Sequence, residues 1–219
     1  MRWLYGVAVL LAALQLVAAD AGAVVPAFEP VAVLAEESGV PNTVTGLILR
    51  NRLYDTDFEV VVFSTAILGA QYLLADERPT ANVAQFTDIP SIVLARVGAT
   101  ISALIGVELA IRGHLTPGGG FAAGVAGGTA IGLVAITASS PWMEAIYKRW
   151  RAAMWEKLSV VTFIGVAVIA LAGWELPKGE LGDLFSGGWI PILNILVAIK
   201  VALGSWAAIL IFIRYRGLL

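Results

Sequence analysis

The sequence predicts an all-α protein, a polytopic transmembrane helix bundle of about six transmembrane helices. Of its 219 residues, 59% are hydrophobic and only 14% are charged, and the mean hydropathy is +0.86. Soluble domains carry about 45–50% apolar and about 25% charged residues, so the chain is expected to be an integral membrane protein. Its apolar residues also gather into stretches long enough to cross a bilayer.

Each predicted span is a mostly apolar stretch near the length of about 20 residues that a membrane helix needs. Arg2 precedes the first, and Val17-Ala18-Ala19 follows its apolar core, so a cleaved signal peptide stays open as an alternative there. Pro90 suits the start of the third, where its missing N–H costs little. The expected spans are Trp3–Ala19, Asp57–Leu74, Ile92–Ile111, Gly120–Ala138, Leu158–Trp174 and Trp189–Ile213.

The segment from Asp20 to Asp57 receives no firm assignment. Its apolar run Val44–Leu49 is too short to span, and three prolines interrupt the residues before it. A re-entrant helix and a surface helix are both compatible with this pattern.

Small residues run along the fourth predicted span. Gly120, Gly124, Gly128 and Gly132 recur at four-residue spacing, the arrangement that lets another membrane helix approach closely. The stripe therefore predicts tight helix packing and says nothing direct about chemistry.

Basic residues outside the spans predict the orientation. The strongest cluster comprises Lys148, Arg149, Arg151 and Lys157, between the fourth and fifth spans. Placing it in the cytoplasm puts both termini inside and the Gly-rich segment before the fourth span outside.

That segment, Gly113–Phe121, has the sequence Gly-His-Leu-Thr-Pro-Gly-Gly-Gly-Phe and breaks the helix between two apolar stretches. Between membrane spans such backbone must pack against protein or face water. It holds His114, the only histidine. Two interpretations of His114 stay open: a loop histidine that bonds the glycine-rich backbone, and a proton relay.

Charged residues within spans are functional candidates because burying a charge in a membrane is costly. Glu59 lies near the start of the second span, and Glu108 lies four residues before Arg112, a spacing that also permits a simple ion pair. Lys200 has eleven residues of mainly apolar span before it and thirteen after. It is expected either to take part in ion or proton movement or to pair with a buried carboxylate.

Composition excludes several classes of protein. The chain has no cysteine, which rules out disulfides, thiolate metal sites and iron–sulfur ligation. With a single histidine and no clustered carboxylates, no metal site and no cofactor is predicted. A net charge of −2 without a basic stripe predicts no nucleic-acid partner. Electron carriers of any larger assembly would have to sit on other subunits.

The stretch Arg112–Gly124 resembles a known signature. It is similar to the Gly-His-x-x-Pro-Gly-Gly-Gly-Phe motif of the MnhB-like subunits of multisubunit Mrp-type Na⁺/H⁺ antiporters. The matching residues are Gly113, His114, Pro117, Gly118, Gly119, Gly120 and Phe121. The resemblance covers roughly Ile89 to Leu219.

A second resemblance lies in the first third of the chain. Arg50–Val62 looks like the Asp-Thr-x-x-Glu segment in the C-terminal tail of the large subunit of these antiporters, with Asp57-Phe58-Glu59 where the family usually has Leu-Gly-Glu. Together the two resemblances predict a two-helix element at residues 1–88, similar to the tail of the large subunit, and a four-helix MnhB-like domain at residues 89–219.

The resemblance implies a non-catalytic part of a larger machine in the cell membrane. The leading hypothesis is a membrane subunit of a Na⁺/H⁺ antiporter module, in contact with other Mrp-type subunits and the lipid bilayer. Its ion-path candidates are Glu59, Glu108 and Lys200, with Asp55 and His114 behind them. The alternative is a structural membrane subunit of a redox-driven ion pump, of the membrane-bound hydrogenase or sulfur reductase type, joined to a hydrogenase-like redox arm. A self-sufficient carrier is disfavoured because no inverted repeat is visible.

Overall fold

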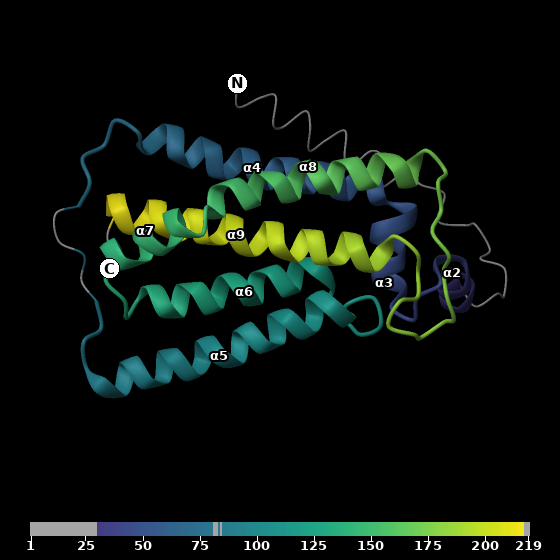
Figure 1. The fold of residues 1–219 in the computed structure, drawn as a ribbon, viewed down its shortest axis with the longest axis horizontal. Coiled ribbons are helices and arrows are strands. Elements are labelled where there is room, and N and C mark those ends of the chain that lie inside the picture. The colour runs from purple at the N-terminus through teal and green to yellow at the C-terminus, as the bar shows by residue number, and fades with distance from the viewer. Residues whose placement is uncertain (1–29, 81–82, 84, 217–219) are drawn as a thin grey trace, which may run out of the picture. The chain divides into compact units, whose positions relative to one another are not determined.

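The structure, a computed structural model, describes residues 30–80, 83 and 85–216. The chain divides into two units, Met1–Pro30 and Val31–Leu219, and nearly all the described residues belong to the second. Every regular element among the described residues is helical (Figure 1). In order they are α2 (Pro30–Ser38), α3 (Thr43–Gly46), a π-helical turn η1 (Leu47–Asn51), α4 (Leu53–Leu74), α5 (Ile89–Arg112), α6 (Gly119–Ala135), α7 (Ser140–Arg149), α8 (Ala152–Leu171) and α9 (Ile190–Arg216).

The all-helical prediction is confirmed for the described residues, but the count of about six spans is not. Four helices, α4, α5, α8 and α9, are long and apolar enough to cross a membrane by length and composition. The predicted fourth span corresponds to α6, an apolar helix of only 17 residues. The predicted first span and its signal-peptide alternative lie outside the described residues.

The described part of the segment between Asp20 and Asp57 contains three short helical pieces before α4 begins. Asn42 caps the second of them, α3, and its side chain accepts a hydrogen bond from the Thr45 backbone N–H at 3.3 Å. A π-helical turn follows and leads into α4, which begins at Leu53, four residues before the predicted span.

Helix α9 lies between α6 and α8 and also contacts α4 and α5 (Figure 1). Its contact with α6 depends on glycine. A Cβ added at Gly124 would lie 2.4 Å from the Val201 Cβ, and one added at Gly128 would lie 2.6 Å from the Ser205 Cβ. Only hydrogen fits at these positions, so the predicted close approach is confirmed, with α9 as the partner.

On its other face, α6 packs against α5. Ser102 of α5 donates a hydrogen bond to the Ala126 carbonyl at 2.8 Å, and a Cβ at Gly106 would lie 3.0 Å from the Ala123 carbonyl oxygen. The small residues thus join three helices, α5, α6 and α9, into one closely packed layer.

Helix α7 connects α6 to α8 and is absent from the elements that the sequence predicts. Pro141 lies in its first turn, and Lys148 and Arg149 lie in its last, where positive charge offsets the helix dipole. Arg151, at φ 50°, then turns the chain into α8. The basic cluster predicted between two spans is therefore split between the end of α7 and the beginning of α8.

Candidate functional site

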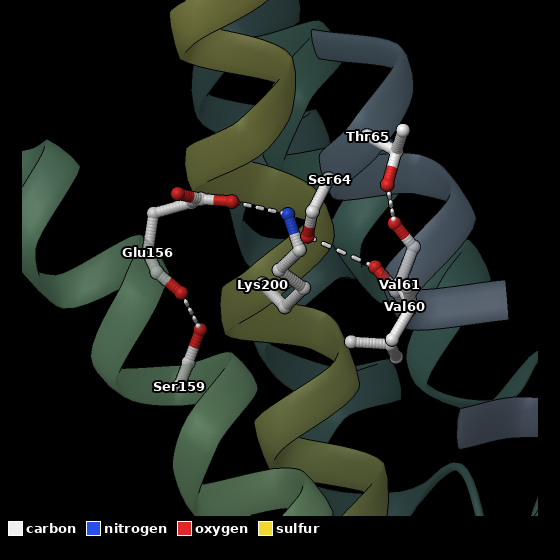
Figure 2. A network of polar contacts seen from close by, with 7 residues as sticks. All are labelled: Val60, Val61, Ser64, Thr65, Glu156, Ser159 and Lys200. Atoms are coloured by element: carbon white, nitrogen blue, oxygen red, sulfur yellow. Dashed lines mark hydrogen bonds and ion pairs between the residues drawn. The ribbon is translucent and has the colours of Figure 1, made fainter. Parts of the chain in front are cut away.

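A buried ion pair joins α8 to α9 (Figure 2). The Lys200 ammonium donates a hydrogen bond to the Glu156 carboxylate. The Lys200 side chain is 1% exposed and that of Glu156 is 14% exposed. The ammonium also lies 4.8 Å from the centre of the Phe63 ring of α4, a cation–π contact that is strengthened where water is excluded. Three helices therefore enclose one positive charge.

Gly204, about one turn after Lys200 on α9, makes this arrangement possible. A Cβ at Gly204 would lie 2.5 Å from Cε1 of Phe63 and 3.3 Å from the Lys200 Nζ. Glycine therefore leaves the space that the ring and the ammonium occupy.

Neighbouring hydroxyl groups are committed within their own helices. Ser64 donates to the Val60 carbonyl at 2.9 Å, and Ser159 donates to the Glu156 carbonyl at 2.7 Å (Figure 2). Among the described residues, the Glu156 carboxylate is thus the one ion-pair partner of Lys200.

Glu156 is a residue that sequence reasoning missed. Three consecutive polar or amphipathic residues, Trp155-Glu156-Lys157, place the start of the fifth predicted span at Leu158, whereas α8 begins at Ala152. Glu156 therefore lies inside the helix and turns toward Lys200. The signal that could have located it is the buried lysine itself, because such a lysine requires an acid nearby.

A second polar cluster holds the Gly-rich turn between α5 and α6. The Asn42 amide donates to the carbonyls of Gly113 and Thr116, at 2.7 Å each. The Thr45 hydroxyl donates to the Gly113 carbonyl at 3.0 Å. These two side chains supply partners for backbone that would otherwise be unpaired at the end of a membrane helix.

Asn194 of α9 completes this cluster. It is fully buried, and its amide donates to the Leu109 and Ala110 carbonyls at 3.0 and 2.8 Å. Gly118 and Gly119 take φ values of 133° and 69°, which are unfavourable for residues with a side chain. Two of the four glycines in the motif are therefore required by backbone conformation.

His114 is fully buried beside this turn. Its Nε2 lies 3.0 Å from the Leu184 carbonyl oxygen, and no described residue partners its Nδ1. Burial holds the pKa of His114 below its ordinary value, although the backbone groups of Leu184 and Asp183 oppose that shift. Through this contact His114 joins the Gly-rich turn to the loop before α9.

The remaining predicted candidates lie apart from the buried pair. Asp55 accepts a hydrogen bond from Arg52 at 2.6 Å, and Glu108 pairs with Arg112 at 3.2 Å, both near helix ends. Glu59 is exposed and lines a cavity of about 330 Å³ together with Gly118–Phe121 and Asn194. The ion pair of Glu108 is with Arg112 and that of Lys200 is with Glu156, so the described contacts do not bring Glu59, Glu108 and Lys200 together.

No metal site emerges from the residues described. Nowhere among them do three or more His, Asp or Glu side chains gather closely enough to hold an ion. The polar groups of the site instead form a buried ion pair between two helices and hydrogen bonds to a backbone turn.

Known proteins share this architecture. The chain is similar to one in the structure of the membrane-bound sulfane sulfur reductase, an archaeal respiratory membrane complex, with 27% identity, a TM-score of 0.65, and coverage of 97% of this chain and 98% of that one. A chain of the Mrp complex from Dietzia sp. DQ12-45-1b has the same fold at 21% identity and a TM-score of 0.63, over 95% of this chain and 25% of that one. An uncharacterized protein of Methanocaldococcus jannaschii is 25% identical over 78% of this chain and 77% of its own length.

A family match covers more than half of the sequence and includes the Gly-rich turn, the buried pair and most of α9. Residues 90–207 match the family described as a domain related to the MnhB subunit of Na⁺/H⁺ antiporter. This protein therefore belongs to the MnhB-related family.

Proposed function

We propose that this chain is a membrane subunit of a multisubunit Na⁺/H⁺ antiporter module that contributes both to assembly and to ion-path coupling. The observation that carries the proposal is the buried Lys200–Glu156 pair at the centre of the bundle. A buried ion pair is weak evidence for stability alone, because apolar residues of similar size often serve as well. Its place among three membrane helices supports a role in charge movement.

The coupling is electrostatic. In surroundings of low dielectric, a charge on a neighbouring subunit changes the balance between the paired, charged state and a neutral state of Lys200 and Glu156. A shift of a proton within the pair in turn changes the potential felt by that neighbour. The pair thus acts as a relay of charge state and needs no continuous water path of its own.

Glu59 is proposed as a second polar position, where the chain faces a partner. It lies on α4 one turn before Phe63, the residue that contacts Lys200. Glu59 also lines the cavity beside the Gly-rich turn. Glu108 and Asp55 already have surface ion-pair partners, and surface ion pairs contribute little to stability. We therefore rank Glu108 and Asp55 behind Glu59 as ion-path positions.

The division of the chain follows from the same proposal. Residues 1–88 would correspond to an element like the tail of the large antiporter subunit, and residues 89–219 to the MnhB-like domain. The family match begins at residue 90, directly after the loop that joins α4 to α5.

A second function has one specific observation in its favour. The similarity to a chain of the sulfane sulfur reductase covers 97% of this sequence and 98% of that chain. In this alternative the protein is a structural membrane subunit of a redox-driven ion pump, and the buried pair serves packing.

The test starts from the complex recovered in mild detergent through a tag after Leu219, with its subunits identified by mass spectrometry. Transport is then measured as Na⁺-dependent dissipation of a pH gradient in everted vesicles. The double variant Lys200→Met/Glu156→Leu removes both charges without stranding either, and Lys148→Met, which breaks the exposed pair with Glu144, is the matched control.

We expect an assembled complex that loses Na⁺-dependent exchange only in the double variant. Full exchange by the assembled double variant would refute the coupling role. Partners with iron–sulfur or [NiFe] signatures would favour the redox-driven alternative.

A further inference from the structure

Residues of helices α5, α6, α7 and α9 line an open groove of about 780 Å³. We call it the α5–α7 groove and define it by its lining residues. Most of these are apolar: Ala99, Ala103, Ala130, Val134, Ile146 and Trp206 are among them. The volume falls within the range of about 300–1,000 Å³ found for small-molecule sites.

Arg96 introduces a positive charge into this apolar lining. It is exposed, and none of the described carboxylates lies within ion-pair distance of it. The other arginine of α5, Arg112, has Glu108 as its partner. A guanidinium near the end of a membrane helix either reaches the aqueous boundary or pairs with an anion there, so Arg96 is available to an anion supplied from outside the chain.

A second donor at the same groove lacks an acceptor. Trp206 lines the groove, and its indole N–H is buried with no described hydrogen-bond partner. Ser139 adds a hydroxyl group to the lining, whereas the Thr100 hydroxyl already donates to the Arg96 carbonyl at 2.9 Å. The groove therefore offers an apolar floor together with the Arg96 guanidinium and the Ser139 hydroxyl as donors to a negatively charged, oxygen-rich group.

The level of Arg96 along α5 matches the boundary region of a bilayer. It lies seven residues after Ile89, about 10 Å along the helix, and an arginine side chain spans much of that distance to reach the surface. Trp142, 49% exposed on α7, lines the same groove, and tryptophan favours the membrane boundary. Lys148 and Arg149 lie in the last turn of α7 and add basic residues at the end of that helix.

From these observations we infer that the α5–α7 groove binds an anionic phospholipid, with its phosphate on Arg96 and an acyl chain along the small residues of α5 and α6. Basic pockets between membrane helices are a known setting for anionic headgroups. The small side chains Ala99, Ala103 and Ala130 leave space for a chain of methylene groups. The inference concerns a different site from the Lys200–Glu156 pair and stands independently of the proposed transport function.

The experiment uses the purified complex in nanodiscs that contain a trace of phosphatidylglycerol with a photoreactive diazirine in its acyl chain. After irradiation, labelled peptides are mapped by mass spectrometry. Phosphatidylcholine carrying the same group is the comparison lipid. We expect the phosphatidylglycerol probe to label residues 99–103 and 130–146 preferentially.

Substitutions identify the phosphate contact. Arg96→Gln should reduce this labelling about five-fold, since each basic residue near an anionic surface contributes about 1 kcal/mol. Arg96→Lys should retain most of it. Arg149→Gln, which removes a charge at the same end but outside the groove, should leave it unchanged.

Three results would overturn the inference. They are equal labelling by both lipids, labelling that is insensitive to Arg96→Gln, and cross-linking to another subunit from a benzoylphenylalanine placed at Ile131 in the groove. The last would show that a protein helix, and not a lipid, occupies this surface.

Discussion

Gly124 lies in the contact between α6 and α9, and its replacement by alanine tests the glycine packing directly. The added Cβ would lie 2.4 Å from the Val201 Cβ and 2.9 Å from the Ala198 carbonyl oxygen. Non-bonded carbon atoms rest at about 3.5–4.0 Å, so the two helices must separate by about 1 Å or more. The conflict involves the Cβ of residue 201, which Val201→Ala would not remove.

The matched control is Gly165→Ala, in the middle of α8. No heavy atom lies within 4 Å of a Cβ at Gly165. Both substitutions gain up to about 1 kcal/mol of helix propensity, so this contribution cancels when the two variants are compared. The remaining difference is the cost of overpacking, about 1–3 kcal/mol.

Thermal unfolding of the detergent-solubilised complex is the assay. For a chain of this size, 1 kcal/mol changes the midpoint by about 2–4 °C, so Gly124→Ala should unfold about 2–12 °C below Gly165→Ala. If Gly124→Ala unfolds at the same temperature as Gly165→Ala, or higher, the helices are not in the close contact described, and the packing argument fails.

Three further outcomes are expected. Lys200→Met strands the buried Glu156 carboxylate and should cost about 3–5 kcal/mol; adding Glu156→Leu should restore most of this in a thermal double-mutant cycle, and a single variant as stable as the double one would contradict the buried pair. Burial lowers the pKa of His114 from 6.5. Below pH 6.5 the unfolded chain therefore binds a proton at His114 more readily than the native state does, and the free energy of unfolding falls as the pH falls. A melting series from pH 8 to pH 5 checks this, with a flatter profile expected for His114→Gln. Asn42→Ala removes the side-chain donor of the Thr116 carbonyl and leaves the Thr45 hydroxyl as the donor to the Gly113 carbonyl, and should cost about 1–3 kcal/mol. The exposed Thr65→Ala, which removes only a hydroxyl bonded within its own helix, should change the melting temperature little.

The helices could be predicted from the sequence because their signal is local. Long apolar stretches identified α4, α5, α8 and α9, and the glycine spacing of α6 identified a close helix contact. The predicted beginning of α8 is six residues too late, since Glu156 reads as a surface residue until its partner is known. That partner, Lys200, is 44 residues away, and no local pattern reports such a distance.

We call the hydrogen-bonding cluster of Asn42, Thr45 and Asn194 the clamp on the Gly-rich turn. It could not be predicted from the sequence either. Asn42 lies in a segment whose prolines and short apolar run favoured no single structure, yet its amide reaches Gly113 and Thr116. The sequence identified the turn as needing protein or water around it, but not which side chains supply it. His114 was recognised as the titratable residue of the turn, while its contact with Leu184 depends on the loop before α9.

The clamp also bears on how the chain folds after synthesis. The carbonyls at the end of α5 depend on Asn194 of α9, which leaves the ribosome 84 residues after Ala110. Until α9 inserts, those carbonyls must bond to water, so α5 and α6 cannot settle as a finished hairpin in the bilayer. The turn therefore reaches its final structure only after α9 has inserted. A chain truncated before α9 would keep these carbonyls hydrated at the membrane and would be exposed to the machinery that removes misassembled proteins.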